Sequence, residues 1–146
     1  MEADAYADSS FLVSLHRADS FHHAANAFLG KNAFTLAFTA LHRVEVRNAL
    51  RNATAAGDMT KAECATAFRQ IEEDLRDGLL VHAQVHWTDA FRRADRLSEK
   101  HAVTEGQRII DLLHVAVALE CGAQIFLSFD KRQRKLAKAA GLAIKP

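Results

Sequence analysis

Apolar residues recur every three or four positions along much of the chain, which is the spacing of one helix face. The clearest case is 40–55, where Thr39 can act as the N-cap and Gly57 follows as a helix-ending residue. Thr60 and Glu63 then have the spacing of a capping box at the start of the next helix. The predicted helices run from 9 or 10 to 16, from 20 to 28 or 29, from 40 to 55, from 60 to 76, from 88 to 101, from 109 to 121 and from 130 to 141. Ser9 or Ser10 is the predicted N-cap of the first of these helices, and Thr88 is that of the fifth.

Short runs of strand type lie between these helices. Residues 34–38 alternate Phe, Leu and Phe with Thr and Ala, whereas 5–7 is Ala-rich and a poor strand by propensity. The predicted strands cover 5–7, 34–38, 79–81, 125–127 and 142–144. Because parallel neighbours need long crossovers, strands separated by helices favour a parallel sheet. The predicted class is α/β, with a short central parallel sheet flanked by helices on both faces.

The composition fits one globular domain over residues 1–146. Hydrophobic residues make up 49% of the chain and charged residues 25%, with a single proline, which argues against a disordered chain. The net charge of +1 does not by itself indicate a nucleic-acid partner. Cys64 and Cys121 lack metal-type spacing, and no segment has the length of a membrane span. We therefore expect a cytoplasmic protein with free thiols and no membrane partner.

Asp8 and Asp130 each follow a predicted strand and precede a predicted helix. In open parallel sheets, binding sites form at the carboxyl ends of the strands, so both side chains would face the same crevice. Each residue alone also has an ordinary explanation, because Asp in this position is a favoured N-cap. Taken singly, capping is the better explanation.

Asp111 and Glu45 lie within predicted helices. Asp111 interrupts the apolar segment 109–121, where an unpaired carboxylate would be costly, although a first-turn position also suits a negative charge beside the helix dipole. Glu45 lies in mid-helix, where a solvated side chain, or one bonded to His42 or Asn48 one turn away, is the simplest explanation.

Four carboxylates brought together have a chemistry that none has alone. They repel one another, and a hard cation such as Mg²⁺ or Mn²⁺ removes this penalty by binding between them. Four acids could hold one ion or two, and two ions about 3.5–4 Å apart would clamp a phosphodiester. The pattern therefore predicts a divalent-metal site.

Four short motifs carry these acids. They are Tyr6-Ala7-Asp8-Ser9-Ser10, Thr39-Ala40-Leu41 through Glu45-Val46-Arg47-Asn48-Ala49-Leu50, Arg108-Ile109-Ile110-Asp111-Leu112-Leu113-His114, and Leu127-Ser128-Phe129-Asp130-Lys131. In order and context they resemble the PIN-domain nucleases, especially the VapC-type toxins of bacterial toxin–antitoxin pairs. The likeness covers essentially the whole chain, and its specificity comes from the set rather than from any one motif.

The resemblance implies a PIN-like fold and a divalent-metal-dependent endoribonuclease, a hydrolase that cuts RNA with a metal-activated water. With Mg²⁺ or Mn²⁺ as the cofactor, it places metal-binding and catalytic roles on Asp8, Glu45, Asp111 and Asp130. The hydroxyls of Ser10 and Ser128 would support these ligands or position water. It also implies inhibition by a cognate antitoxin protein encoded alongside. Exposed apolar helices would in addition suit a homodimer.

Two groups of basic residues are candidates for RNA binding. The first group lies at four-residue intervals on the helix of the second motif and consists of Arg43, Arg47 and Arg51. The second group starts the basic helix after the fourth motif and begins with Lys131 and Arg132. Phosphate contact is more credible for the second group, which lies beside a predicted metal ligand. A solvated face is the ordinary explanation for any single member.

The main alternative function is a catalytically inactive PIN-like module that binds RNA or a protein, and the presence of all four acids speaks against it. A nucleotide-binding α/β domain is disfavoured because no Gly-rich phosphate loop follows a predicted strand. The histidines show no convincing zinc-ligand spacing. His42 and His114 lie near predicted acids, but as core or surface histidines they need no catalytic role.

Overall fold

The computed structural model describes residues 2–146, in which short parallel strands form the centre of the protein. Strands β1, β4 and β5 form one sheet and β2 and β3 another, and an isolated parallel bridge between Ala5 and Leu36 joins the two. The combined order is β3-β2-β1-β4-β5, with every pair parallel, which confirms the predicted α/β class. The strands are β1 (Tyr6–Ala7), β2 (Leu36–Phe38), β3 (Leu80–His82), β4 (Ile125–Leu127) and β5 (Ala143–Lys145).

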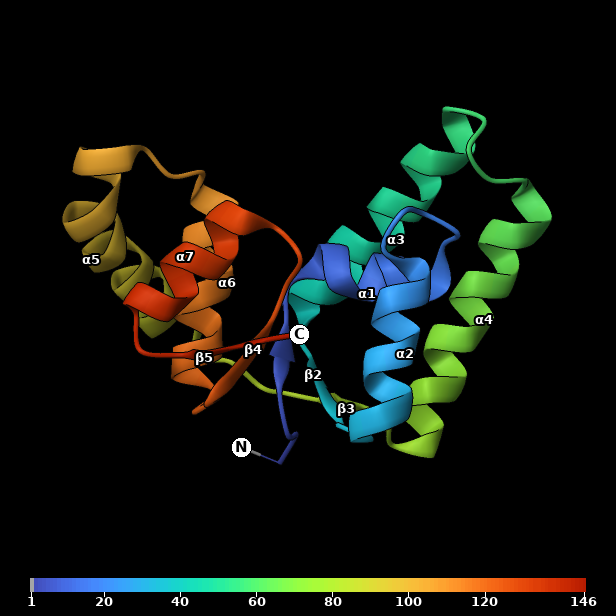
Figure 1. Cartoon of the computed structure of the whole chain (residues 1–146), viewed down its shortest axis with the longest axis horizontal. Helices are drawn as coiled ribbons and strands as arrows, with labels where there is room; N and C mark the ends of the chain where they lie inside the picture. Colours follow the sequence, from blue (N-terminus) through green and yellow to red (C-terminus); the bar gives the residue numbers. More distant parts are fainter. Residues whose placement is uncertain (1) are drawn as a thin grey trace.

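Helices cover both faces of this sheet (Figure 1). The four helices of the first half of the chain pack on one face and the last three on the other. They are α1 (Ser9–His16), α2 (His22–Asn32), α3 (Ala40–Ala55), α4 (Lys61–Asp77), α5 (Trp87–Glu105), α6 (Ile109–Glu120) and α7 (Lys131–Ala139). None of the helices within residues 2–146 is both long enough and apolar enough to cross a membrane.

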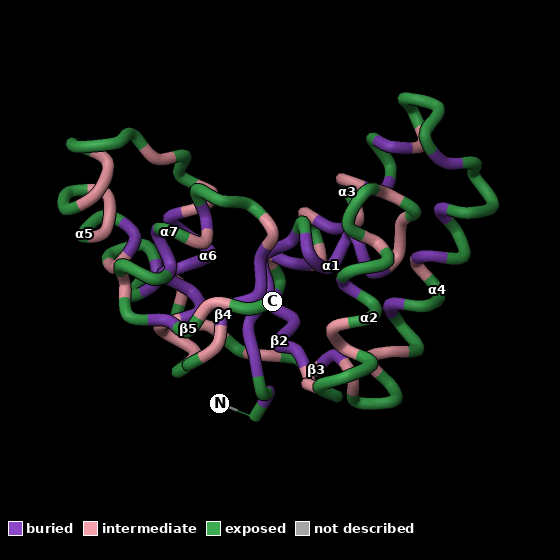
Figure 2. Tube along the Cα trace, in the orientation of Figure 1, coloured by how far each residue is buried: buried purple, intermediate pink, exposed green. Residues whose placement is uncertain are grey.

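The protein has two hydrophobic cores, one on each face of the sheet. Successive residues of the central strands contribute to different cores, because neighbouring side chains of a strand point to opposite faces. Ala7 and Leu127 belong to the core under α1–α4, whereas Tyr6 and Phe126, one residue earlier, belong to the core under α5–α7. All four are fully buried, and Figure 2 shows the centre of the molecule as its most buried part. The Tyr6 and Phe126 rings stack with centroids 5.7 Å apart. The central strands are therefore buried on both faces, as is typical of parallel sheets.

Helices α1 and α5 differ from the predicted boundaries. The N-cap of α1 is Asp8, so the prediction that Ser9 or Ser10 caps this helix was wrong. Helix α5 begins at Trp87, one residue before its predicted cap, and continues past the predicted end at 101 until Gly106. Gly106 has a positive φ of 62°, and it is the first residue after 101 that favours leaving the helix.

Four strands also differ from the prediction. β1 covers Tyr6–Ala7 instead of 5–7, and β3 covers Leu80–His82 instead of 79–81. β2 begins at Leu36, because the backbone N–H of Thr35 is bonded to the Asp4 carboxylate at 2.9 Å rather than to a neighbouring strand. β5 covers Ala143–Lys145, one residue later than predicted. Helix α2 covers His22–Asn32 instead of 20–29. These differences move element ends without changing the order of elements.

The strand order places a crevice between β1 and β4. The chain leaves β1 toward β2 and β3 on one side and later returns to β4 on the other side of β1. In open α/β sheets a binding crevice forms at such a switch point, outside the carboxyl ends of the strands. Asp8 directly follows β1, and Ser128 and Asp130 follow β4 within a few residues. The topology therefore brings these residues to the same edge.

Candidate active site

Asp8 is a buried carboxylate whose two oxygens are both held by hydrogen bonds. One oxygen accepts from the backbone N–H of Phe11 and from the hydroxyl of Ser10, each at 2.8 Å. The other accepts from the hydroxyl of Ser128. Burial raises the pKa of Asp8, while these three hydrogen bonds oppose the rise. The side chain therefore has one fixed orientation at the end of β1.

Ser128 connects Asp8 to Asp130. Its buried hydroxyl donates to Asp8 and accepts a hydrogen bond from the backbone N–H of Asp130 at 3.0 Å. Asp130 itself is exposed at the start of α7, where its carboxylate caps the helix by accepting from the backbone N–H of Gln133 at 2.9 Å. The capping explanation for both acids is confirmed, and one hydroxyl links them.

Glu45 reaches the same region from α3, and its partners come from two other helices. The hydroxyl of Ser9 on α1 donates to Oε1 of Glu45 at 2.8 Å, and Nε2 of His114 on α6 contacts the same oxygen. Burial raises the pKa of Glu45, but the hydrogen bond and charge of His114, together with Ser9, outweigh it, so the net shift is downward. The ionised carboxylate can only accept, so Nε2 of His114 carries a proton.

Tyr6 holds the far side of the His114 ring. Its hydroxyl lies 2.7 Å from Nδ1 of His114, and both residues are buried. Burial raises the pKa of Tyr6 well above its ordinary value, so the hydroxyl keeps its proton and stays in hydrogen-bond contact with Nδ1 of His114. A chain of hydrogen bonds thus runs from Tyr6 on β1 through His114 to Glu45.

His42 ties the start of α3 to the end of β1. Its Nε2 donates to the carbonyl of Ala7 at 2.8 Å, and its Nδ1 accepts from the backbone N–H of Thr39 at 3.0 Å. These partners fix the neutral tautomer with the proton on Nε2. Burial, followed by the nearby charge of His114, lowers the pKa of His42 to about 3. Because Ala7 directly precedes Asp8, this contact holds the backbone that presents Asp8.

Asp111 stands apart from the other three acids. It occupies the first turn of α6 and pairs with Arg108, whose Nε lies 3.0 Å from its Oδ2. Its connection to the other acids runs through the backbone, since the side-chain amide of Gln133 donates to the Asp111 carbonyl at 3.1 Å. Gln133 also supplies the N–H that Asp130 caps. The ion pair with Arg108 is the partner that a carboxylate in an apolar segment requires.

A cleft of about 590 Å³ opens over these groups. Glu45 and Asp130 line it together with Ser9 and Ser10, whereas neither Asp8 nor Asp111 does. Within residues 2–146, no three His, Cys, Asp or Glu side chains converge closely enough to hold a metal ion. Two of the four predicted acids, Glu45 and Asp130, therefore share the cleft, whereas Asp8 is linked to Asp130 through Ser128 and Asp111 is linked to it through Gln133.

The donor chemistry at this crevice suits a divalent cation. All four predicted ligands offer carboxylate oxygens, which Mg²⁺ and Mn²⁺ prefer to nitrogen or sulfur. Mg²⁺ usually keeps several waters and takes only one or two carboxylates together with substrate phosphate, so a closed cage of acids is not required. Glu45 and Asp130, which share the cleft, are enough for such a partial set.

The predicted basic group on α3 is engaged by α4. The guanidinium groups of Arg47 and Arg51 each lie 5.1 Å from the centroid of the Phe68 ring. Arg43 pairs with Glu72 at 2.7 Å. Cation–π and ion-pair contacts of this kind give these side chains a packing role between the two helices.

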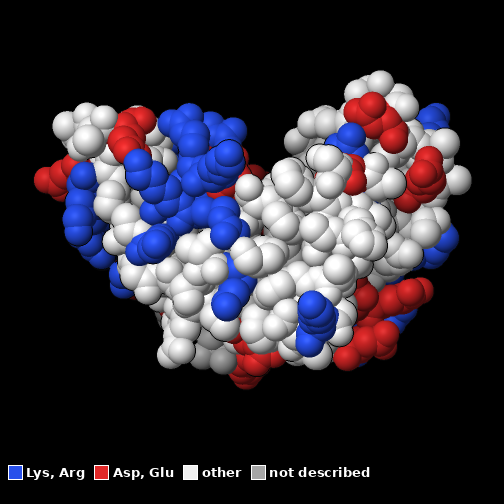
Figure 3. Space-filling view, in the orientation of Figure 1, with Lys and Arg blue, Asp and Glu red and all other residues white. Residues whose placement is uncertain are grey.

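The basic group on α7 has different surroundings. Figure 3 shows Lys and Arg side chains gathered over α7 on one side of a hollow in the surface, with a mostly uncharged side opposite. Lys131 and Arg132 are both exposed, and Arg132 donates to the carbonyl of Gly106 at 2.9 Å. Positive charge is therefore available beside Asp130.

Sequence reasoning missed the roles of Tyr6, Ser9 and His114, which join Glu45 to β1, α1 and α6. One available signal was the spacing of His114, which lies three residues after Asp111 and so shares its side of α6. We predicted that His114 could be a core histidine with no catalytic role, and the side chain is indeed buried. It nevertheless contacts a predicted metal ligand.

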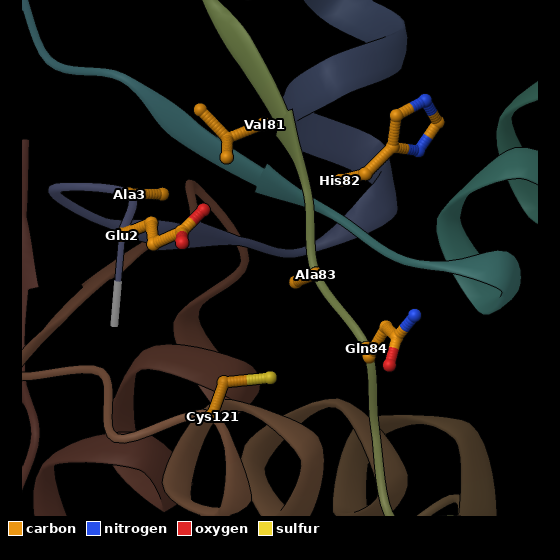
Figure 4. A pocket seen from close by; sticks show the side chains of 7 residues that line it. All are labelled: Glu2, Ala3, Val81, His82, Ala83, Gln84 and Cys121. Atoms are coloured by element: carbon orange, nitrogen blue, oxygen red, sulfur yellow. The ribbon is translucent and has the colours of Figure 1, made fainter.

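A second cavity, of about 340 Å³, contains none of the predicted acids (Figure 4). Glu2 and Cys121 line it, on one side of the segment that carries Val81 and Ala83. Burial raises the pKa of Cys121, so its thiol stays protonated and is a poor nucleophile. Cys64 and Cys121 are both free thiols, as predicted. The cavity has no set of groups that suggests catalysis.

Three solved structures have similar folds. PAE2754 from Pyrobaculum aerophilum aligns with a TM-score of 0.62 and 19% identity, over 99% of this chain and 90% of that one. VapBC2 from Rickettsia felis, bound to a DNA fragment from their promoter, aligns with a TM-score of 0.64 and 13% identity, over 97% and 96%. FitAcB from Neisseria gonorrhoeae gives the same four values as VapBC2. A comparison with curated protein sequences finds no significant match.

The fold and the crevice define an α/β protein with a parallel sheet and carboxylates at the carboxyl ends of β1 and β4. The sequence matches the PIN domain over residues 5–139, which is nearly the whole chain. The protein therefore belongs to the PIN-domain family, and the predicted PIN-like fold is confirmed.

Proposed function

We propose that this protein is a divalent-metal-dependent endoribonuclease of the VapC type, the toxin of a toxin–antitoxin pair. The observation that carries the proposal is the linked set Asp8–Ser128–Asp130, with Glu45 facing the same cleft. PIN-domain membership supports nuclease activity, and the four sequence motifs support the VapC type.

The proposed metal ligands are Asp8, Glu45, Asp111 and Asp130, with Mg²⁺ or Mn²⁺ as the cation. When bound, the cation supplies an activated water and offsets the charge that develops on the phosphodiester. Ser10 and Ser128 keep the Asp8 carboxylate oriented through their hydrogen bonds. Ser9 and His114 do the same for Glu45. Lys131 and Arg132 are placed to contact RNA phosphates beside Asp130, whereas Arg43, Arg47 and Arg51 chiefly pack on α4.

The proposed partners are RNA, a cognate antitoxin and a second copy of the chain, in the cytoplasm. The fold likeness to VapBC2 and FitAcB supports the antitoxin. The exposed apolar side chains Val103 and Ile109 would suit an interface between two copies.

The test is cleavage of a labelled single-stranded RNA by the purified chain with Mg²⁺, with Mn²⁺ and with EDTA. Cutting in either metal that stops in EDTA is the expected result. Cutting that persists in EDTA contradicts metal dependence. If the RNA stays intact with either metal, the inactive PIN-like binding module becomes the better explanation. Crystals soaked in Mn²⁺ should show anomalous density at Asp8, Glu45 and Asp130.

A further inference from the structure

Three phenylalanine rings form a stack that runs from the core to the cleft. Phe11 on α1 and Phe129 after β4 stack with centroids 5.4 Å apart and planes 18° apart. Phe129 and Phe21, which precedes α2, stack with centroids 4.7 Å apart and planes 6° apart. Phe11 is fully buried, Phe129 is half-buried and Phe21 is exposed. The stack therefore begins in the core and ends at the surface.

The surface end of the stack lies in the cleft of the proposed active site. Phe21 and Phe129 line the same cleft as Glu45 and Asp130. The exposed fraction of Phe21 is 46%, a large area for an aromatic side chain that has already found a stacking partner. Phe129 directly precedes Asp130, so the same short segment of backbone positions both the middle ring of the stack and the acid.

The backbone at Phe21 is also held in place. Asp19 accepts from the backbone N–H of Phe21 at 3.0 Å and from the hydroxyl of Ser14 at 2.8 Å. A ring fixed by stacking and by its backbone loses little conformational entropy when a ligand covers it. The exposed ring is therefore preorganised to accept a planar group.

We propose that Phe21 is a stacking platform for a nucleobase of single-stranded RNA that enters the cleft lined by Glu45 and Asp130. Stacking on aromatic side chains is the usual way in which proteins hold unpaired bases. The charged groups in and beside the cleft favour RNA over an apolar peptide, because Arg17 lines the cleft and exposed Lys131 and Arg132 directly follow Asp130. This inference rests on the proposed function and adds a base-binding subsite to it.

The proposed subsite would not read base identity. A phenylalanine ring has no hydrogen-bonding group, and every base has an aromatic face, so the contact tolerates any sequence. Phe21 should therefore increase affinity for unpaired RNA of any composition and should contribute nothing to binding of a duplex.

The first test measures binding of fluorescent single-stranded RNA in EDTA, so that no RNA is cut. Phe21→Ala should weaken binding about tenfold, within the range found for single base-stacking contacts, and Phe21→Tyr should restore it. Phe91→Ala is the matched control, since Phe91 is 55% exposed on α5 and does not line the cleft. Thermal melts of each variant establish that it is folded.

The second test places a fluorescent reporter on the platform. Phe21→Trp should show quenching of tryptophan fluorescence when single-stranded RNA is added, because a base covers the indole, and Phe91→Trp should not. The half-buried Trp87 contributes the same background to both variants.

The outcomes separate this inference from the proposed function. If the wild-type protein cuts RNA with Mn²⁺ but Phe21→Ala binds RNA as tightly as wild type, the platform is overturned while the nuclease stands. Equal quenching of Phe21→Trp and Phe91→Trp also overturns it, because the RNA would then cover no particular ring. If the wild-type protein neither binds nor cuts RNA, both proposals fall.

Discussion

The four acids form two pairs that the fold treats differently. Asp8 and Glu45 are held by buried side chains from other elements, Ser128 and His114. Asp111 and Asp130 are held locally, by an ion pair within one helical turn and by a helix cap. The first pair, the inner pair, is therefore tied to other elements of the fold, whereas the second, the outer pair, is tied to its own helix. Substitutions in the inner pair should disturb folding and chemistry together, whereas loss of the exposed Asp111 ion pair should change stability little.

The largest expected effect comes from Asp8→Asn. The amide keeps the size of the side chain and can still cap α1, but it loses the charge that a cation requires. RNA cleavage should fall by more than about 100-fold, because loss of a group that only supports a ligand already costs about 10- to 100-fold. Asp8→Ala should in addition lower the free energy of unfolding by about 1–2 kcal/mol through the lost cap.

Asp111→Asn is the control from the outer pair. Its ion pair involves an Arg108 side chain that is 67% exposed, so its loss should change the unfolding free energy by less than about 1 kcal/mol. Cleavage should fall if Asp111 binds metal. A loss of stability for Asp111→Asn as large as that for Asp8→Ala would remove the distinction between the two pairs.

The next largest effect is expected from the buried side chains that hold Glu45, His114 and Tyr6. His114→Ala should reduce the kcat of cleavage about tenfold, because Glu45 loses the contact that orients it. Tyr6→Phe removes only the hydroxyl behind His114 and should lower the unfolding free energy by about 1 kcal/mol. A His114→Ala variant that melts early yet cuts with unchanged kcat would give His114 a packing role alone.

A smaller effect follows from the neutral His42. Its pKa is about 3 in the folded protein against an ordinary value of 6.5, so only the unfolded chain takes up this proton between these two pH values. The stabilisation is complete above pH 6.5 and is lost as pH falls toward 3, by about 1 kcal/mol per pH unit. Burial lowers the pKa of His16 as well, which adds to the loss.

Denaturant unfolding at pH 7, 6 and 5 measures this slope. His42→Gln cannot take up the proton, so its stability should fall less steeply than that of wild type over the same range. Parallel slopes for the two proteins would show that His42 is not the group that titrates.

The smallest expected effect separates the two basic groups. Replacing Lys131 and Arg132 by Ala should weaken RNA binding several-fold and flatten its salt dependence by about 1.4 in log–log slope, or about 0.7 for each lost phosphate contact. Replacing Arg47 and Arg51, whose guanidinium groups lie over Phe68, should leave that slope unchanged and lower stability instead. Equal slopes for both double variants would contradict the assignment of RNA contact to α7.

Local sequence signals predicted the elements and the position of the acids. The Thr39 and Thr60 caps marked the starts of α3 and α4, because capping is a contact between residues three apart. The Ser9–Glu45 and His114–Glu45 contacts join residues 36 and 69 positions apart, and no periodicity in one sequence reports such distances. The sequence motifs also could not predict how close the four acids lie to one another, because this depends on where α6 packs in the fold.

The brevity of β1 has a consequence for how the protein can change. This strand is two residues long, and its two side chains belong to different cores, Ala7 to one and Tyr6 to the other. A larger residue at position 7 would push on α1–α4, and a smaller one at position 6 would leave a void beneath α6. Either change would move the backbone that carries Asp8. The packing of both cores thus acts on the backbone of one dipeptide, which directly precedes Asp8.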